Sequence, residues 1–220
     1  MFTHVIFDLD GTLMDTLEDL ADATNWVCEQ HGWPTHPLEA YKYFVGNGAS
    51  KLLERAIPKE VEWTRELHTQ VLEEFTLRYT AHKADKTRVY PGMPELLKRL
   101  REEGIPTAVL TNKPHWAAIP VVEQYLPGLL TTVQGALPDM PTKPDPTLLH
   151  RLMERIGAKP ETTLFVGDSN VDIQTAKNGG LTSCGVLWGF RSRAELEAEG
   201  ADHLAETPEE LAQLILEQSQ

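Results

Sequence analysis

Two carboxylates one residue apart, Asp8 and Asp10, follow a short apolar run and are the first candidates for chemistry. The run over residues 5–7 predicts a buried strand, because strands covered on both faces of a parallel sheet are continuously apolar. Ligands of open α/β sheets bind beyond the carboxyl ends of the strands, where both acids fall. Such close acids repel each other unless a cation or a shared proton relieves them. Mg²⁺, which prefers oxygen ligands, fits that need; on these residues alone a simple polar turn stays an equal alternative.

Polar side chains also follow two later apolar runs. Thr111 and Asn112 end the second run, Asp168 ends the third, and Asp172 lies one helical turn further on. If these strands are adjacent and parallel, their ends meet at one edge of the sheet. Taken singly, the two acids suit a helix N-terminus and the Thr-Asn pair suits a turn. Four acids at two strand ends exceed what capping requires, which favours a divalent cation.

A lysine in a stiff, proline-framed stretch is a further candidate. Lys143 lies between Pro141 and Pro146, before a predicted helix. A single lysine is most often a solvated charge. An ammonium fixed between prolines is also suited to bind phosphate or to neutralise a crowded cluster of acids.

The order of predicted elements indicates the fold class. Strands alternate with helices in most of the chain, which predicts an α/β fold with a doubly wound parallel sheet. Residues 16–82 show helical spacing alone and predict an inserted helical domain. We therefore expect a core formed by residues 1–15 and 83–220. In the core, Pro120 must start or kink the helix expected over 116–126.

Composition narrows the function further. The net charge of −13 argues against binding nucleic acid or an anionic membrane, which needs a basic surface. The two cysteines, Cys28 and Cys184, lie far apart and are expected to be buried thiols. No apolar stretch reaches the roughly 20 residues that span a bilayer, and no signal peptide stands at the N-terminus, so we expect a cytoplasmic protein. We expect the binding partner to be a small phosphorylated metabolite and the chain to be a monomer or a homodimer.

These motifs, in this order, resemble those of the haloacid dehalogenase (HAD) superfamily of phosphatases, and the resemblance covers nearly the whole chain. It rests on Asp-x-Asp-Gly-Thr at residues 8–12, Thr111 after an apolar strand, Lys143, and Gly-Asp-Ser at residues 167–169 followed by Asp172. The helical insertion is similar to the small cap domain of that family. The resemblance implies a core with a Rossmann-like sheet and an inserted helical cap.

The resemblance also implies a role for each motif residue. Asp8 would attack phosphorus and form an aspartyl-phosphate, and Asp10 would act as general acid and base. Phosphoryl oxygens would be held by Thr111, Lys143, Gly11 and Asn112. The implied cofactor is Mg²⁺, held by Asp8, the Asp10 backbone carbonyl and Asp168, with Asp172 binding it directly or through water.

Several stretches are similar to the phosphoglycolate phosphatase branch, which implies a small substrate such as 2-phosphoglycolate. They include residues 45–49, 111–114 and 186–189. In the insertion, four residues are candidates for substrate contact: Asn47, Gly48, Lys51 and Arg55. Residues 46–48 suit an ordinary helix-breaking turn equally well. Ala136 and Val171 depart from the pattern of many relatives and weaken the substrate assignment without removing a catalytic group.

Alternatives of several kinds stay open. A phosphosugar mutase resembling β-phosphoglucomutase shares all four motifs, and a phosphatase for another sugar phosphate or a nucleotide differs in substrate alone. A dehalogenase is disfavoured because such enzymes lack an acid at the position of Asp10. A phosphoacceptor switch resembling a response-regulator receiver also lacks that acid and the insertion. A catalytically silent binding protein is disfavoured by the full set of catalytic residue types.

Overall fold

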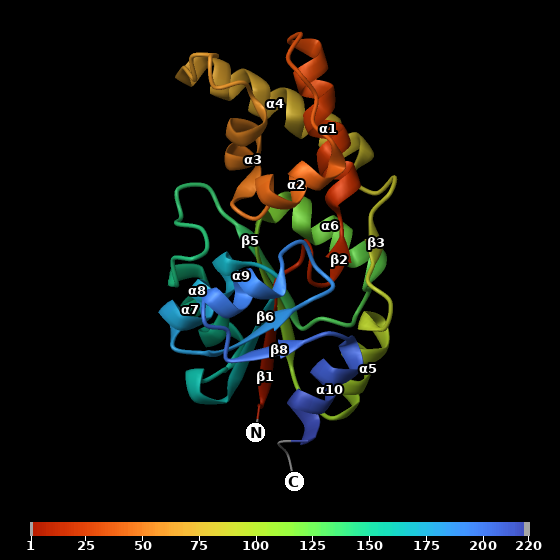
Figure 1. Cartoon of the computed structure of the whole chain (residues 1–220). Helices are drawn as coiled ribbons and strands as arrows, with labels where there is room; N and C mark the ends of the chain where they lie inside the picture. Colours follow the sequence, from red (N-terminus) through yellow and green to blue (C-terminus); the bar gives the residue numbers. More distant parts are fainter. Residues whose placement is uncertain (1, 218–220) are drawn as a thin grey trace. The chain divides into compact units, whose positions relative to one another are not determined.

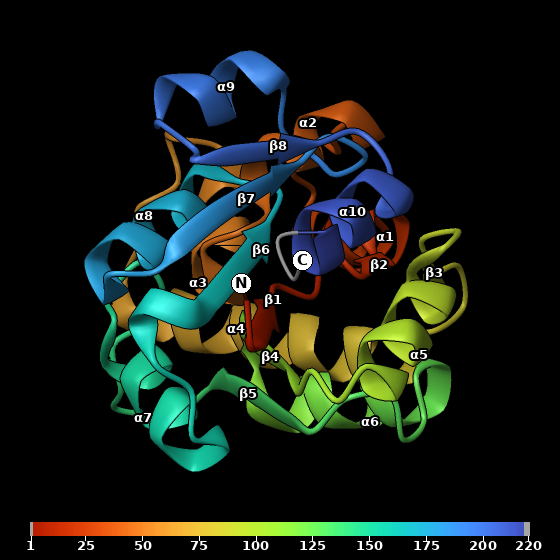
Figure 2. The same ribbon diagram turned by 90° about the horizontal axis from the view of Figure 1, so that it is seen from below.

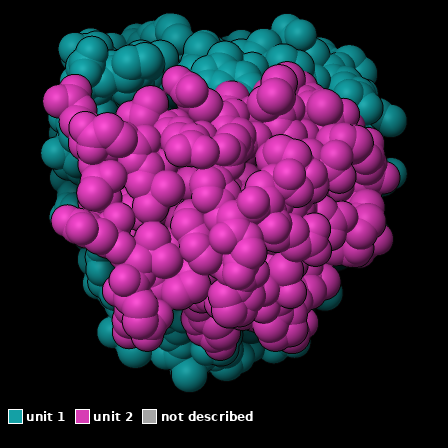
Figure 3. Space-filling view, turned by 90° about the horizontal axis from the view of Figure 1, so that it is seen from above, with its two compact units in different colours: residues 1–14, 89–220 teal, residues 15–88 magenta. Residues whose placement is uncertain are grey.

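The computed structural model describes residues 2–217 of the 220-residue chain. The chain divides into two compact units, unit 1 with residues 1–14 and 89–220 and unit 2 with residues 15–88 (Figure 3). The helical insertion expected over residues 16–82 falls within unit 2. Short strands β2 (Met14–Asp15) and β3 (Arg88–Val89) pair where the chain passes from one unit to the other.

Unit 1 is built on a six-stranded sheet in which every neighbouring pair is parallel. In spatial order the strands are β5 (Thr132–Ala136), β4 (Thr107–Pro114), β1 (His4–Phe7), β6 (Thr163–Gly167), β7 (Thr182–Val186) and β8 (His203–Ala205). This arrangement confirms the predicted fold class of a parallel α/β sheet.

Strand β1 lies in the middle of the sheet, and this placement brings the motifs together. Phe7 is level with Val109 of β4 on one side and with Val166 of β6 on the other. The chain beyond β1 stays attached to β6, because the Asp8 N–H donates to the carbonyl of Val166 at 2.8 Å. The carboxyl end of β1 therefore lies between those of the two strands that carry the other motif residues.

Helices cover both faces of this sheet (Figures 1 and 2). On one face Val5 and Phe7 pack with α5 (Met93–Glu102), α6 (His115–Tyr125) and α10 (Pro208–Glu217). On the other face Ile6 packs with α7 (Thr147–Ile156) and α8 (Asn170–Gly179). The alternation of these three β1 residues between two cores explains why residues 5–7 are all apolar. A short 3₁₀ helix η1 (Pro160–Thr162) and helix α9 (Arg193–Ala198) complete the unit.

Two features of unit 1 differ from the sequence interpretation. Strands β5 and β8 were not predicted; β8 has three residues, and the apolar run of β5 is interrupted by Gln134 and Gly135. Strand β4 extends to Pro114, so the polar residues after Leu110 still belong to the strand. Pro120 lies inside α6, so of its two predicted effects, starting or kinking the helix, the kink stays a prediction.

Unit 2 contains the helices α1 (Leu17–Gln30), α2 (Leu38–Phe44), α3 (Gly48–Ala56) and α4 (Arg65–His82). The helical content of the insertion was predicted. Helix α4 begins at Arg65, where the Thr64 side chain caps it. None of the helices in residues 2–217 combines the length and the apolar character that crossing a bilayer requires. Both cysteines are buried free thiols, as predicted.

Candidate active site

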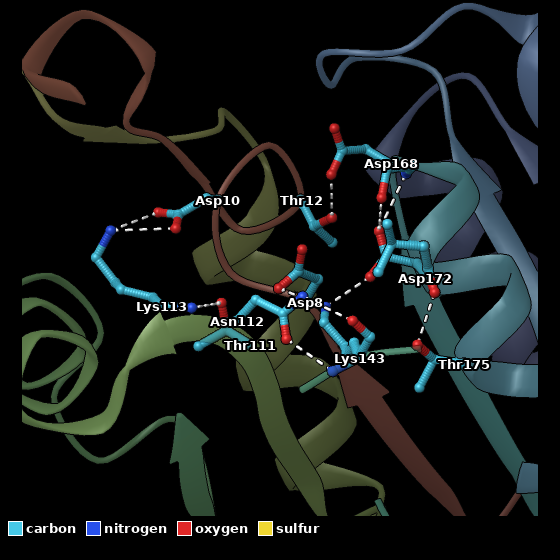
Figure 4. Close-up of polar contacts among 12 residues, drawn as sticks. Asp8, Asp10, Thr12, Thr111, Asn112, Lys113, Lys143, Asp168, Asp172 and Thr175 are labelled. Atoms are coloured by element: carbon cyan, nitrogen blue, oxygen red, sulfur yellow. Dashed lines mark hydrogen bonds and ion pairs between the residues drawn. The ribbon is translucent and has the colours of Figure 1, made fainter. Parts of the chain in front are cut away.

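Asp8 lies at the centre of a cluster of charged side chains beyond the carboxyl end of β1 (Figure 4). Its carboxylate is buried, and Lys143 Nζ lies 2.9 Å from its Oδ1 atom. This is an ion-pair distance, but the angle is not that of a hydrogen bond, and no donor among residues 2–217 bonds to Oδ1. An acceptor buried in this way is unusual, because nearly all buried polar atoms in proteins have hydrogen-bond partners.

Lys143 bridges two acids. Besides its contact with Asp8, its ammonium donates to Asp172 Oδ1 at 2.6 Å. Although burial disfavours its charge, Asp172 and Asp8 raise the pKa of Lys143 above its ordinary value. The main chain of Lys143 is held by Asn112, whose side-chain amide accepts from the Lys143 N–H at 2.8 Å and donates to its carbonyl at 3.0 Å. Asn112 therefore positions Lys143, while its predicted contact with phosphate stays a prediction.

Asp168 accepts hydrogen bonds from two neutral donors and packs against two glycines. Thr12 Oγ1 donates to Oδ1 at 3.1 Å, and the backbone N–H of Phe190 donates to Oδ2 at 2.8 Å. A Cβ atom on Gly11, which has a φ of 88°, would lie 2.4 Å from Oδ2, and a Cβ on Gly189 would lie 2.3 Å from the Asp168 Cβ. Both positions must therefore be glycine for this carboxylate to lie where it does.

Asp172 occupies the first turn of α8 and is fully buried. Its Oδ2 atom accepts from the backbone N–H of Ser169 at 3.1 Å and from Ser169 Oγ at 2.7 Å, as in a capping box. Gly167 makes room for it, since a Cβ there would lie 2.2 Å from the Asp172 Cβ. With Lys143 on its other oxygen, Asp172 is occupied by protein donors on both oxygens.

The three acids are suited to hold a metal ion. Asp8, Asp168 and Asp172 each offer an oxygen, and these oxygens lie within 4.8 Å of one another. Burial raises the pKa of Asp8 to about 7, with Asp172 and Asp10 adding to the shift and Lys143 opposing it. Burial, Asp172 and Asp8 likewise raise the pKa of Asp168 well above its ordinary value. Buried carboxylates that repel each other, one with an oxygen lacking a hydrogen bond, fit a hard divalent cation.

Asp10 lies on the other side of Asp8 from Asp168 and Asp172 (Figure 4). Its two oxygens accept from Lys113 Nζ at 2.9 and 3.1 Å, and the lysine side chain is 3% exposed. Lys113 comes from the end of β4, where the Thr111 hydroxyl accepts from its backbone N–H at 3.2 Å. Thr111 and Lys113 are both buried at the end of a strand next to β1.

The four substrate-contact candidates of the insertion lie in unit 2, where two of them contact each other. Arg55 donates to Asn47 Oδ1 at 2.7 Å and to the carbonyl of Phe44 at 2.9 Å, which ties α3 to the end of α2. Lys51 pairs with Glu54 at 2.6 Å on an exposed surface. Gly48 has a φ of 83° and begins α3. These contacts explain the residue types by local structure, and substrate contact stays a prediction.

Sequence reasoning missed several residues of the site. Lys113 was noted within a motif but given no role, and its pairing with Asp10 joins positions 103 residues apart. Thr12 lies in the first motif, and its hydroxyl could have been recognised as a donor to an acid. The N–H of Phe190 is a backbone group and leaves no signal in the sequence.

Comparison with known proteins identifies the family. The family model of haloacid dehalogenase-like hydrolases matches residues 5–186. A phosphoglycolate phosphatase from Pseudomonas putida is 37% identical over 199 residues, which cover 89% of this chain and 73% of the relative. One from Vibrio parahaemolyticus is 32% identical, covering 96% of this chain and 95% of the relative. The crystal structure of a candidate phosphoglycolate phosphatase from Lactobacillus delbrueckii subsp. bulgaricus superposes with a TM-score of 0.90 at 32% identity and covers 98% of both chains.

The chain belongs to the haloacid dehalogenase-like hydrolase family. The resemblance read from its motifs is therefore confirmed. The relatives named above also confirm the predicted enzyme class, a phosphoric monoester hydrolase similar to phosphoglycolate phosphatases.

Proposed function

We propose that the protein is a Mg²⁺-dependent phosphomonoester hydrolase that acts through an aspartyl-phosphate on a small metabolite such as 2-phosphoglycolate. The observation that carries this proposal is the position of Asp8. It lies between a buried ammonium and two further acids on one side and the Asp10–Lys113 pair on the other. Such a carboxylate can attack phosphorus while both the phosphoryl charge and the leaving group have partners.

In the first step, an oxygen of Asp8 forms a bond to phosphorus as the bond from phosphorus to the ester oxygen breaks. Asp10 gives its proton to that oxygen, so the product leaves as a neutral alcohol. Lys143, which lies 2.9 Å from Asp8, is placed to bind the oxygens of the phosphoryl group during the transfer. Thr111 is the second candidate for that contact.

In the second step, Asp10 takes a proton from water, and the water oxygen attacks phosphorus. The bond between Asp8 and phosphorus breaks, which restores the Asp8 carboxylate and releases orthophosphate. Asp10 ends with the proton that it needs for the next cycle. The two steps together consume one water for each phosphate released.

Mg²⁺ would be held by Asp8, Asp168 and the Asp10 segment, and Asp172 would support the site. Asp172 has protein donors on both oxygens, which favours an indirect role for it, through water or through Lys143. When bound, the ion supplies positive charge that lets an anionic nucleophile approach an anionic phosphate. The support for this ligand set is the cluster of raised carboxylate pKa values and the Asp8 oxygen without a hydrogen bond.

The substrate proposal rests on the relatives named phosphoglycolate phosphatase. It is tested by phosphate release from 2-phosphoglycolate, several sugar phosphates and nucleoside monophosphates, each with Mg²⁺, with EDTA, and with Asp8→Asn. We expect Mg²⁺-dependent release that is highest for 2-phosphoglycolate and lost in Asp8→Asn. The substituted asparagine keeps the size of the side chain but is not a nucleophile.

The outcomes separate the parts of the proposal. Release that survives in Asp8→Asn would disprove the covalent mechanism. Release that is faster from another phosphomonoester would replace the substrate but keep the mechanism. Isomerisation of β-glucose 1-phosphate without net phosphate release would show a mutase instead.

A further inference from the structure

Lys113 is a buried cation at the leaving-group end of the site, and the proposed chemistry gives it no role. Its side chain is 3% exposed, and its ammonium reaches both oxygens of Asp10. Burying an ammonium is costly even when an acid accompanies it. If the substrate also carries a negative charge at this end, that charge helps the Asp10 carboxylate to offset the cost of burying the Lys113 ammonium.

We propose that Lys113 recognises a carboxylate on the leaving group of the substrate and thereby selects 2-phosphoglycolate over phosphomonoesters that lack an acid. This inference rests on the proposed function and extends it from the reaction to the selection of substrate. It makes Lys113 a specificity-determining residue in unit 1, independent of any substrate contact that unit 2 supplies.

The distances place Lys113 within reach of such a carboxylate. To act as general acid, Asp10 must lie about 2.6–3.2 Å from the ester oxygen of the substrate. The Lys113 ammonium lies 2.9 and 3.1 Å from the Asp10 oxygens, so it is at most two hydrogen-bond lengths, roughly 6 Å, from that ester oxygen. In 2-phosphoglycolate a single methylene carbon separates the ester oxygen from the carboxylate. The carboxylate can therefore reach the ammonium when the ester oxygen meets Asp10.

The charges of the site support the same assignment. Lys143 contacts Asp8 and Asp172, on the side of the phosphoryl group. Asp10 and Lys113 lie together on the opposite side of Asp8 (Figure 4). A substrate with a phosphate at one end and a carboxylate at the other thus meets one ammonium at each end. An ammonium has three donors in different directions and can bind a substrate carboxylate beside Asp10.

The competing explanation is that Lys113 merely positions Asp10. A positioning role predicts an equal loss for every substrate whose leaving group needs a proton, whereas recognition predicts a loss that depends on the substrate's carboxylate. The two are separated by comparing 2-phosphoglycolate with its neutral amide, 2-phosphoglycolamide, which differs by one charge and whose leaving group also departs as an alcohol that needs a proton from Asp10. The ratio of the two kcat/KM values removes any effect on Asp10.

The test measures this ratio in four proteins: wild type, Lys113→Met, Lys113→Arg and Lys98→Met. Met keeps the length of the side chain and removes its charge, Arg keeps a positive charge, and Lys98 is an exposed lysine of α5 that controls for the loss of one charge from the protein. We expect the acid-to-amide ratio to fall about tenfold or more in Lys113→Met, as expected for the loss of a charge-assisted contact. It should be largely kept in Lys113→Arg and unchanged in Lys98→Met.

A ratio that is unchanged in Lys113→Met, with both rates reduced alike, would overturn the inference and leave a positioning role. If Lys113→Met does not fold, judged by its thermal unfolding, Lys113→Gln provides the same comparison. A wild type that hydrolyses both compounds without preference would also overturn the inference while the phosphatase proposal stands. A wild type that releases phosphate from neither would refute the proposed function itself.

Discussion

The two sides of Asp8 hold their acids in different ways. On one side, Asp168 accepts from the neutral donors Thr12 and Phe190 N–H, and Asp172 accepts from Ser169 as well as from the Lys143 ammonium. Both acids also pack against glycines. On the other side, Asp10 is held by the ammonium at the end of the long Lys113 side chain. Rigid neutral donors suit acids that must stay charged and still to hold a cation. A movable charge suits an acid that must gain and lose a proton in each cycle.

The largest effect is expected at Lys143, which joins Asp8 to Asp172. In Lys143→Met, Asp8 and Asp172 lose their shared cation, and the phosphoryl group loses a donor. We expect kcat to fall about 100- to 1,000-fold on every substrate, the acid and its amide alike. We also expect the metal-free protein to lose about 3–5 kcal/mol of stability, the usual cost of leaving a buried charge without its partner.

Steady-state kinetics and urea unfolding in EDTA measure both effects. Lys113→Met is the matched comparison, because it removes the other buried lysine. The acid that loses this lysine is Asp10, whose side chain is 12% exposed. Its loss of stability should be clearly smaller. Equal losses in the two variants would show that the two sides of Asp8 are not held differently.

The next largest effect is expected for a substitution of Gly11, which packs against Asp168. Gly11→Ala places a Cβ 2.4 Å from Asp168 Oδ2, so the carboxylate must move. We expect the Mg²⁺ concentration for half-maximal activity to rise about 10- to 100-fold, the range seen when the surroundings of metal ligands are changed. A rise in KM for substrate at saturating Mg²⁺ would instead support the predicted contact of Gly11 with phosphate.

Gly104→Ala is the control for backbone strain. Gly104 has a φ of 70°, similar to that of Gly11, but a Cβ there would have no atom within 4 Å. Both variants carry the cost of a left-handed alanine, while the Gly11 variant alone displaces an acid. An equal rise in the Mg²⁺ requirement of both would show that strain, and not the clash with Asp168, is the cause.

The sequence was most informative about functional residues that follow the ends of strands. Asp8 and Asp168 were found because an acid after an apolar run is visible locally, and the parallel sheet brings the ends of these runs together. Lys143 was found because it lies in a proline-framed stretch. Strand β5 was missed because Gln134 and Gly135 interrupt its apolar pattern. Gly135 is required there by packing, as a Cβ would lie 2.6 Å from the His115 Cα.

The partners of the acids were less accessible to sequence reasoning. Lys113 meets Asp10 across 103 residues, and no local spacing indicates which of several nearby polar residues an acid will contact. The resemblance assigned Asn112 to phosphate contact, which stays a prediction, but did not indicate that its amide holds the main chain of Lys143. Residue types therefore predicted the chemistry of this site, and three-dimensional packing decided how each group is held.

The smallest effect concerns the pH dependence of stability without metal. The pKa of Asp8 is raised from 3.8 to about 7, chiefly by burial, so between these values the folded protein binds a proton that the unfolded chain lacks. Stability should therefore fall as pH rises from about 4 to about 7 and level off above. In EDTA we expect Asp8→Asn, which cannot ionise, to have the higher Tm at pH 8 and the difference to shrink toward pH 5.

Mg²⁺ should reverse that order, because a bound cation stabilises the wild type by mass action and favours the ionised form of Asp8. Thermal unfolding of both proteins, at several pH values with EDTA or Mg²⁺, measures the two effects together. A difference in Tm that stays constant with pH in EDTA would mean that Asp8 is already neutralised, by Lys143, in the folded protein. The acids around Lys143 would then not destabilise the folded protein when the metal is absent. The role of the fixed donors around Asp168 would still need an explanation.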